Sequence, residues 1–485
     1  MKDLRTLRTL VLRSMENDSA GPALIEGERQ YTFRQFANRA CSMGNALLEL
    51  GLGKGDRVAI LSRNSMESAE VYFSIPNAGL VLVMLNFRLA PPEIKAVLAD
   101  ATPSVLMVNE EFLGCLQEIR GDLAFVSHFV FIGDKAGTPE GWHHYEELIE
   151  QADSHLPAIE VGQDDLAALM YTSGTTGSPK GCMALHRNLY HVARSMNIEM
   201  EMEAEDVGII PTPLFHASGH VVLMNGIYSG ITTVIMPRWD AEEFMSLVER
   251  YRITTGVLAT PMLLFLVNHP HVDRYDLGSL RKVLFAGAPV TPIVFQRAIE
   301  RFGNVFVHGF GTTETMGSVC ILKTEEVARA MADGKFEVLY SCGKAFEGME
   351  FEVVDETGVP VAPGVEGEIR VRGLGTTAGY WNRESETRKS FRDGWFYTED
   401  MCRLDKQGFM HISGRKKEMI ITGGENVYPA EVESVLYKHP GVGLAAVVGT
   451  PDAKWGEIVT AFVVKKDHQD VTEEDDHLFQ ILPVP

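Results

Sequence analysis

The sequence predicts an α/β protein in which parallel sheets are covered by helices, followed by a small β-rich unit and a small α+β unit. Two patterns carry this expectation. Short apolar runs that suit buried strands alternate with helical patterns as far as residue 285, and β-rich runs joined by Gly, Pro and Asp turns follow from residue 351. The chain has 485 residues, of which 45% are apolar and 23% charged, as in an ordinary globular protein with a sizeable core.

The first part of the chain begins with a predicted amphipathic helix over residues 1–15, where arginines alternate with leucines. This segment lacks the apolar core and small-residue cleavage site of a signal peptide. The expected strands are 57–61, 104–108, 129–132, 232–236, 255–258 and 282–285, and helices are expected over 65–78 and 91–99. Such a βα rhythm is typical of parallel sheets with helices on their faces.

The second part of the chain has a different texture. The runs 351–354, 367–372 and 409–412 predict a small antiparallel unit. Beyond residue 415 we expect a strand over 418–422, a helix over 429–439 and a strand over 443–448. A domain boundary is therefore expected near residues 414–417.

Charge and cysteine content restrict the class of protein. The chain carries 44 basic and 66 acidic residues, a formal charge of -22, so on average it repels nucleic acid and anionic membranes. Its six cysteines are scattered without a CxxC pair, which argues against a disulfide framework or zinc site and fits a reducing cytoplasm. The most apolar stretch, 71–87, is interrupted by Ser74, Pro76 and Asn77, so no membrane span is expected.

One motif suggests a phosphate ligand. Residues 171–181 read YTSGTTGSPKG and follow the apolar run 166–170. Its glycines allow close approach of the backbone, its hydroxyls donate hydrogen bonds, and Lys180 adds one mobile cation. The spacing differs from a Walker A loop because Gly181 follows Lys180. The alternative is a flexible linker. The residues expected to bind phosphate are Thr172, Ser173, Gly174, Thr175, Thr176, Gly177 and Lys180.

This loop resembles the phosphate-binding signature of the acyl-adenylate-forming superfamily, which includes acyl-CoA synthetases, firefly-type luciferases and peptide-synthetase adenylation domains. Further motifs resemble the family in the same order along the chain: PLFH at 213–216, GAP at 287–289, GFGTTE at 309–314, GWFYTED at 394–400, GRKK at 414–417 and GGEN at 423–426. An ordered series is far more specific than any single match.

The resemblance implies an AMP-forming acyl-CoA synthetase. Such an enzyme uses ATP and Mg²⁺ to convert a carboxylic acid into an acyl-adenylate and then transfers the acyl group to CoA. The implied architecture is a large N-terminal domain, residues 1–414, with two doubly wound sheets and a small β-barrel-like unit. A mobile α+β domain, residues 415–485, would follow, with a hinge near Lys417.

The resemblance also assigns nucleotide-binding roles. Glu314 and Thr172 would hold Mg²⁺, which prefers hard oxygen ligands. Phe310 would stack on adenine in place of the usual Tyr, and Asp400 would accept hydrogen bonds from the ribose hydroxyls. Arg415 would reach the ribose or phosphate. The remaining implied nucleotide-binding residues are Gly287, Ala288, Pro289, Gly311, Thr312 and Thr313.

Other positions concern the acid and the thiol. His216 would lie at the mouth of the acyl pocket, where amino-acid-activating relatives usually have Asp, so an ordinary organic acid is favoured. Gly309, Met316 and Gly317 would leave room for an aryl or a medium-to-long acyl group. The glycine pair Gly423 and Gly424 would face the pantetheine tunnel, where a side chain would block the thiol.

The sequence departs from the family in two places. Glu399 stands where relatives usually have Gly, and no lysine follows Lys466 although relatives end with a catalytic lysine. A shortened C-terminal domain, impaired in adenylation, is therefore one alternative. Others are a module that loads a carrier protein and a binding protein without catalysis. The oligomeric state stays open, a homodimer included.

Overall fold

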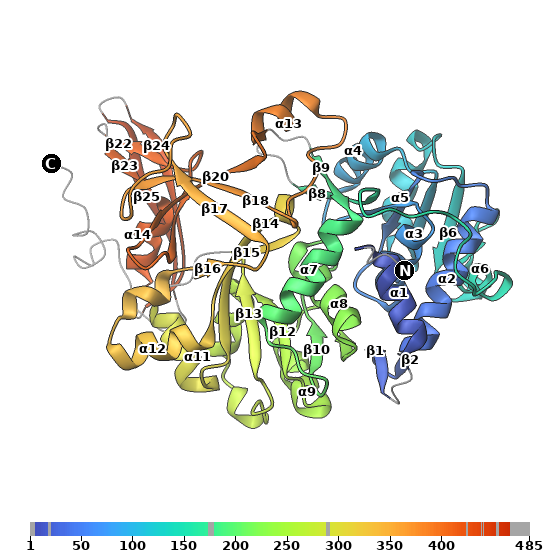
Figure 1. Cartoon of the computed structure of the whole chain (residues 1–485), viewed down its shortest axis with the longest axis horizontal. Coiled ribbons are helices and arrows are strands. Elements are labelled where there is room, and N and C mark those ends of the chain that lie inside the picture. Colours follow the sequence, from blue (N-terminus) through green and yellow to red (C-terminus); the bar gives the residue numbers. More distant parts are fainter. Residues whose placement is uncertain are drawn as a thin grey trace.

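The structure is a computed structural model, and it describes residues 5–17, 21–172, 179–287, 292–422, 425–437, 439, 441–452 and 455–465 (Figure 1). Two large sheets, a smaller antiparallel sheet and a C-terminal sheet follow one another across the molecule. The N-terminal helix α1 (Leu7–Glu16) packs on helices of the first large sheet through buried Leu7, Leu10 and Val11.

The first large sheet has seven strands in the order β7-β6-β5-β3-β4-β8-β9. These are β3 (Arg57–Leu61), β4 (Val81–Met84), β5 (Val105–Asn109), β6 (His128–Ile132), β7 (His143–His144), β8 (Leu166–Thr172) and β9 (Lys180–Leu185). All neighbours are parallel except β8 and β9, which form an antiparallel hairpin. Every residue of β4 is buried, as expected for a strand covered on both faces.

The helices of this sheet are α2 (Phe33–Glu49), α3 (Met66–Asn77), α4 (Pro91–Ala101), α5 (Leu113–Ile119) and α6 (Tyr145–Gln151). Helix α3 begins with a capping box in which Ser65 and Ser68 bond each other's backbone N–H groups. All of its residues are buried, so it forms part of the core between the two large sheets.

The second large sheet has nine strands in the order β16-β15-β14-β13-β12-β10-β11-β1-β2. They are β1 (Pro22–Glu26), β2 (Arg29–Thr32), β10 (Val207–Ile210), β11 (Thr232–Ile235), β12 (Thr255–Ala259), β13 (Lys282–Ala286), β14 (Phe306–Thr312), β15 (Gly317–Leu322) and β16 (Lys344–Ala345). The N-terminal strand β1 completes this sheet by pairing parallel with β11, Leu24 opposite Thr233.

The helices of the second sheet are α7 (His186–Glu199), α8 (Ala217–Ser229), α9 (Ala241–Tyr251), α10 (Thr260–Val267), α11 (Pro292–Phe302) and α12 (Thr324–Asp333). Helices α7 and α8 pack on each other between the two sheets (Figure 1). Helix α7 contacts β9 of the first sheet, whereas α8 contacts β10 and β12 of the second. This pair therefore joins the two sheets into one core.

The smaller sheets complete the chain. The five-stranded antiparallel sheet contains β17 (Met349–Val354), β18 (Glu366–Gly373), β19 (Phe391–Arg392), β20 (Trp395–Leu404) and β21 (Met410–Arg415), with α13 (Glu384–Ser390) beside it. The last sheet contains β22 (Ile420–Thr422), β23 (Glu425–Val427), β24 (Val442–Asp452) and β25 (Gly456–Lys465), with α14 (Pro429–Leu436). Ile420, Leu436 and Val447 give this last sheet a small core of its own.

The predicted fold class is confirmed, and the differences lie at element ends. The strand expected over 57–61 is β3 without a shift, whereas the helix expected over 429–439 ends at Leu436. The sequence places Pro440 close behind, which disfavours helical backbone at the preceding residue. Within the described ranges, none of the helices has both the length and the apolar character needed to span a bilayer.

Candidate nucleotide and acyl site

The ends of the predicted phosphate loop are fixed by the β8–β9 hairpin. Thr172 ends β8, Lys180 begins β9, and the two residues pair across the hairpin. The loop residues between them, Ser173, Gly174, Thr175, Thr176 and Gly177, lie outside the described residues. The first residues of β9 pack closely on β8, because a Cβ on Gly181 would lie 3.0 Å from the ring of Tyr171.

Lys180 and Glu314 lie on either side of one tyrosine. The Lys180 Nζ lies 5.2 Å from the centre of the Tyr380 ring and 2.6 Å from Glu386 Oε2. The Tyr380 hydroxyl donates a hydrogen bond of 2.7 Å to Glu314 Oε1. The base of the loop and the carboxylate expected to bind metal are therefore neighbours. Sequence reasoning missed Tyr380 and Glu386, and the only signal was an aromatic pair, Tyr380-Trp381, that no motif required.

Glu314 is held in a tight turn between β14 and β15. The Thr315 hydroxyl donates to the carbonyl oxygen of Thr312 at 2.9 Å and lies 2.8 Å from that of Gly317. A Cβ on Gly311 would come 1.9 Å from the Gly317 oxygen, so only glycine fits there. The buried Thr312 hydroxyl has no hydrogen-bond partner among the described residues.

The residues expected around adenine lie at the ends of neighbouring parallel strands. Gly287 directly follows β13 with φ 95°, and Phe310 is a half-buried residue near the end of β14. Strands β13 and β14 are parallel, so these positions share one edge of the sheet, where α/β proteins usually bind ligands. Ala288 and Pro289 lie outside the described residues.

Asp400 and Arg415 form the third part of the site. They face each other across β20 and β21, and Arg415 Nε lies 3.2 Å from Asp400 Oδ1. Burial raises the pKa of Asp400 to about 6, Arg415 counteracts this, and the charge of Glu314 raises it further. Glu314 and Lys180 also act in opposite directions on the pKa of the buried Cys182 thiol. The charged groups of Lys180, Glu314, Asp400 and Arg415 thus lie close enough to act on the same part of the site.

His216, which is expected at the mouth of the acyl pocket, stands directly before α8 as its N-cap residue. Its ring lies 4.3 Å from that of buried Phe215. Although His216 retains exposed surface, the surrounding protein and the charge of Arg88 lower its pKa to about 4, so the ring is neutral at pH 7. One turn later, His220 Nε2 lies 3.0 Å from the carbonyl oxygen of Met316 and links α8 to the Glu314 turn.

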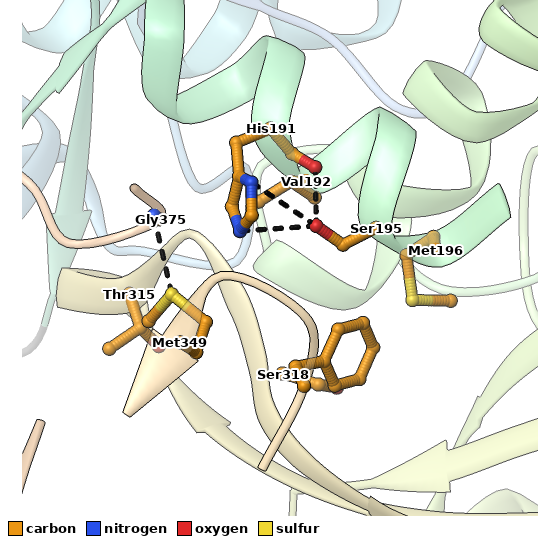
Figure 2. A pocket seen from close by; sticks show the side chains of 9 residues that line it. His191, Val192, Ser195, Met196, Thr315, Ser318, Met349 and Gly375 are labelled. Atoms are coloured by element: carbon orange, nitrogen blue, oxygen red, sulfur yellow. Dashed lines mark hydrogen bonds between the residues drawn. The ribbon is translucent and has the colours of Figure 1, made fainter. Parts of the chain in front are cut away.

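The positions expected to leave room for an acyl group are closely packed. A Cβ on Gly309 would lie 3.0 Å from Leu284, one on Gly317 would lie 3.2 Å from Val221, and Met316 is fully buried. A small pocket borders this region behind Thr315, and Figure 2 shows His191 and Ser195 of α7 facing it. It has room for about one water molecule.

The predicted hinge carries three consecutive cations that face carboxylates. Besides the Arg415–Asp400 pair, Lys416 Nζ lies 3.8 Å from Glu368 and Lys417 Nζ lies 2.7 Å from Glu399. Glu399 has φ 64°, a left-handed conformation that favours glycine, which agrees with the glycine that the family resemblance led us to expect at this position. Gly423 and Gly424 lie outside the described residues.

Helix-covered sheets and a group of two carboxylates, a lysine and an arginine at their edge fit the class of adenylate-forming enzymes that the motifs predicted. The comparisons identify the protein further. The model of the AMP-binding enzyme family matches residues 12–381, and that of the AMP-binding enzyme C-terminal domain matches residues 431–481. The chain belongs to the AMP-binding enzyme family, and the expectation of an AMP-forming acyl-CoA synthetase, an acid–thiol ligase, is confirmed.

Relatives of known activity are similar over most of their length. A feruloyl-CoA synthase from Amycolatopsis sp. is 36% identical over 446 residues, covering 92% of this chain and 86% of the relative. A long-chain-fatty-acid–CoA ligase of Mycobacterium tuberculosis is 34% identical over 446 residues, with coverages of 91% and 84%. The crystal structure of an anthranilate CoA ligase in complex with anthranoyl-AMP superposes with a TM-score of 0.89 at 28% identity, covering 98% and 89% of the two chains.

Proposed function

We propose that the protein activates an aryl carboxylic acid, or a medium- to long-chain fatty acid, with ATP and Mg²⁺ and transfers the acyl group to CoA. The proximity of Lys180 and Glu314, which both contact Tyr380, and the electrostatic effect of Glu314 on Asp400 carry this proposal. Feruloyl and anthranilate substrates of the relatives support an aryl acid, and the fatty-acid ligase supports the second class.

The residues fit Mg²⁺ because Glu314 offers hard carboxylate oxygens, one of which is held by the neutral hydroxyl of Tyr380. Glu314 and Thr172 would hold the ion, whose charge would offset that of the phosphates and the incoming carboxylate. The hydroxyl of Thr312 would donate a hydrogen bond to a phosphate oxygen. Asp400 would accept hydrogen bonds from the ribose, with Arg415 beside it.

In the first step a carboxylate oxygen of the acid attacks the α-phosphorus of ATP, and the bond to pyrophosphate breaks. Lys180, at the base of the loop, would stabilise the departing charge. In the second step the CoA sulfur attacks the acyl carbonyl carbon and the bond to AMP breaks, while the thiol proton passes to solvent. The neutral ring of His216 would border the acid without a charge that could pair with an ammonium group.

We also propose that residues 1–414 and 415–485 are two domains and that the second rotates about Lys417 between the steps. The separate small core around Ile420 supports the division. A few residues at a boundary can absorb such a rotation.

A two-part assay tests the proposal. The purified chain is supplied with ferulate, anthranilate, indoleacetate or octanoate, and acid-dependent ATP–pyrophosphate exchange is measured. CoA-dependent release of AMP is then measured with CoA and, separately, with a holo carrier protein. If the protein shows no exchange with any of these acids and does not bind ATP, adenylate formation is disproved. If the acyl group is transferred to the carrier protein but not to CoA, the carrier protein is the acceptor. Acyl-CoA formed only from preformed acyl-AMP would identify a form impaired in adenylation.

A further inference from the structure

Tyr380 occupies a fixed place at the base of the phosphate loop. Its segment pairs with β9: Met183 N–H donates to the Gly379 oxygen at 2.9 Å, and Trp381 N–H donates to the Gly181 oxygen at 2.8 Å. The Tyr380 residue is 6% exposed. The backbone on both sides of the ring is thus tied to the strand that begins with Lys180.

The hydroxyl of Tyr380 fixes one oxygen of Glu314. The 2.7 Å bond to Oε1 is charge-assisted, a class of hydrogen bond stronger than one between neutral groups. A second tie comes from the backbone, where Thr377 N–H donates to the Glu314 carbonyl oxygen at 2.8 Å.

The ring of the same residue contacts the cation of the loop. The Lys180 Nζ lies 5.2 Å from the ring centre, within the range of a cation–π contact, and its side chain is 18% exposed. Glu386 pairs with the ammonium group at 2.6 Å. One side chain therefore orders an anion through its hydroxyl and a cation through its π face.

We propose that Tyr380 is a positioning residue of the nucleotide site, which aims Glu314 at the metal with its hydroxyl and holds Lys180 toward the phosphates with its ring. This inference rests on the proposed function, since it assumes that Glu314 and Lys180 serve a metal–nucleotide complex. Neither task needs Tyr380 to touch the reacting atoms.

Two substitutions separate the two tasks. Tyr380→Phe keeps the ring and removes the hydroxyl, so binding of the Mn²⁺–ATP complex should weaken about tenfold while ATP binding without metal is unchanged. Tyr380→Leu removes both the ring and the hydroxyl, so it should weaken binding of Mn²⁺–ATP and also binding of ATP without metal. Mn²⁺ electron paramagnetic resonance measures the first affinity, and calorimetry in EDTA measures the second.

A matched control measures how much stability is lost when a buried tyrosine loses its hydroxyl. Tyr145 is buried and donates to buried Glu70 at 2.9 Å, outside the site. Tyr145→Phe should lower the Tm about as much as Tyr380→Phe and leave Mn²⁺–ATP binding unchanged. Unchanged Mn²⁺–ATP affinity in folded Tyr380→Phe would overturn the proposal. Absence of Mn²⁺–ATP binding by the unaltered protein would instead overturn the proposed function.

A measurement that needs no Tyr380 variant covers the case in which Tyr380→Phe does not fold. The 13 tyrosines are replaced by 3-fluorotyrosine, and Mn²⁺–ATP is added while ¹⁹F spectra are recorded. A tyrosine beside the metal loses its resonance through paramagnetic broadening, and the same resonance should shift in the Glu314→Gln protein. If no tyrosine resonance meets both conditions although Mn²⁺–ATP binds, the proposal is wrong.

Discussion

The carboxylate of Glu399 lies 2.7 Å from the ammonium group of Lys417, although Glu399 itself has a left-handed backbone with φ 64°. A backbone hydrogen bond joins the same two segments, because Lys416 N–H donates to the Glu399 carbonyl oxygen at 2.9 Å. A side chain at a position suited to glycine thus reaches the proposed hinge.

Substitutions at Glu399 separate the backbone effect from the ion pair. Glu399→Gly relieves a left-handed conformation that costs about 1 kcal/mol in other residues, whereas Glu399→Gln keeps that cost. Both lose an ion pair between half-exposed side chains, worth about 0–1 kcal/mol. The glycine variant should therefore be more stable than the glutamine variant by about 1 kcal/mol. Urea unfolding of the two proteins measures this, and the reverse order would contradict the account.

The pKa of Asp400 predicts a pH dependence of nucleotide binding. Its value of about 6 means that the carboxyl group gains a proton as the pH falls below 6, and it can then accept fewer hydrogen bonds from a ribose. KM for ATP should rise below about pH 6 in the unaltered enzyme. Asp400→Asn should have a raised KM that does not change across this range. A flat KM in the unaltered enzyme between pH 5 and 7 would contradict the prediction.

The same group predicts a change in folding stability. The folded pKa of Asp400 lies above the usual aspartate value of about 3.8, so the folded state binds the proton more tightly than the unfolded state. The contribution of this group to the free energy of unfolding therefore falls as the pH rises from about 4 to about 6. Asp400→Asn should lose this part of the slope in urea titrations at several pH values.

Gly311 should tolerate no side chain. A Cβ there would lie 1.9 Å from the backbone oxygen of Gly317, which the turn cannot move without losing the Thr315 hydrogen bonds. Gly311→Ala should cost about 2–4 kcal/mol in unfolding free energy and abolish ATP–pyrophosphate exchange. Gly53→Ala is the control, because its nearest atom would be 3.9 Å away. It should change stability by less than about 0.5 kcal/mol.

Lys180 and Glu386 should affect activity unequally. Lys180→Ala removes the loop cation and should lower kcat/KM for ATP by about 10²–10³, as loss of other charge-stabilising groups does. Glu386→Gln leaves the cation in place and should change kcat/KM less than tenfold. Steady-state exchange kinetics compare the two, with Tm as the measure of folding. A larger loss in Glu386→Gln would assign the main role to the carboxylate.

The sequence predicted those parts of the fold that depend on local pattern. Strand β3 coincides with the expected run because the four residues after Arg57 are apolar and buried. The hairpin that holds Thr172 opposite Lys180 was not predicted, since antiparallel pairing across the loop depends on the sheet around it. The motifs located Glu314 and Asp400 along the chain, but Tyr380, 66 residues from Glu314, is joined to it only by tertiary structure.

The pairing of β1 with β11 has a consequence for synthesis of the chain. The Thr232 hydroxyl donates to the Pro22 carbonyl oxygen at 2.7 Å across 210 residues. On a ribosome the N-terminal strand therefore emerges long before its partner exists, and the edge of the nine-stranded sheet stays open until the middle of the protein has been made. Closing this loop costs chain entropy, although the cost grows only slowly with loop length, so the pairing of β1 depends mainly on when β11 becomes available.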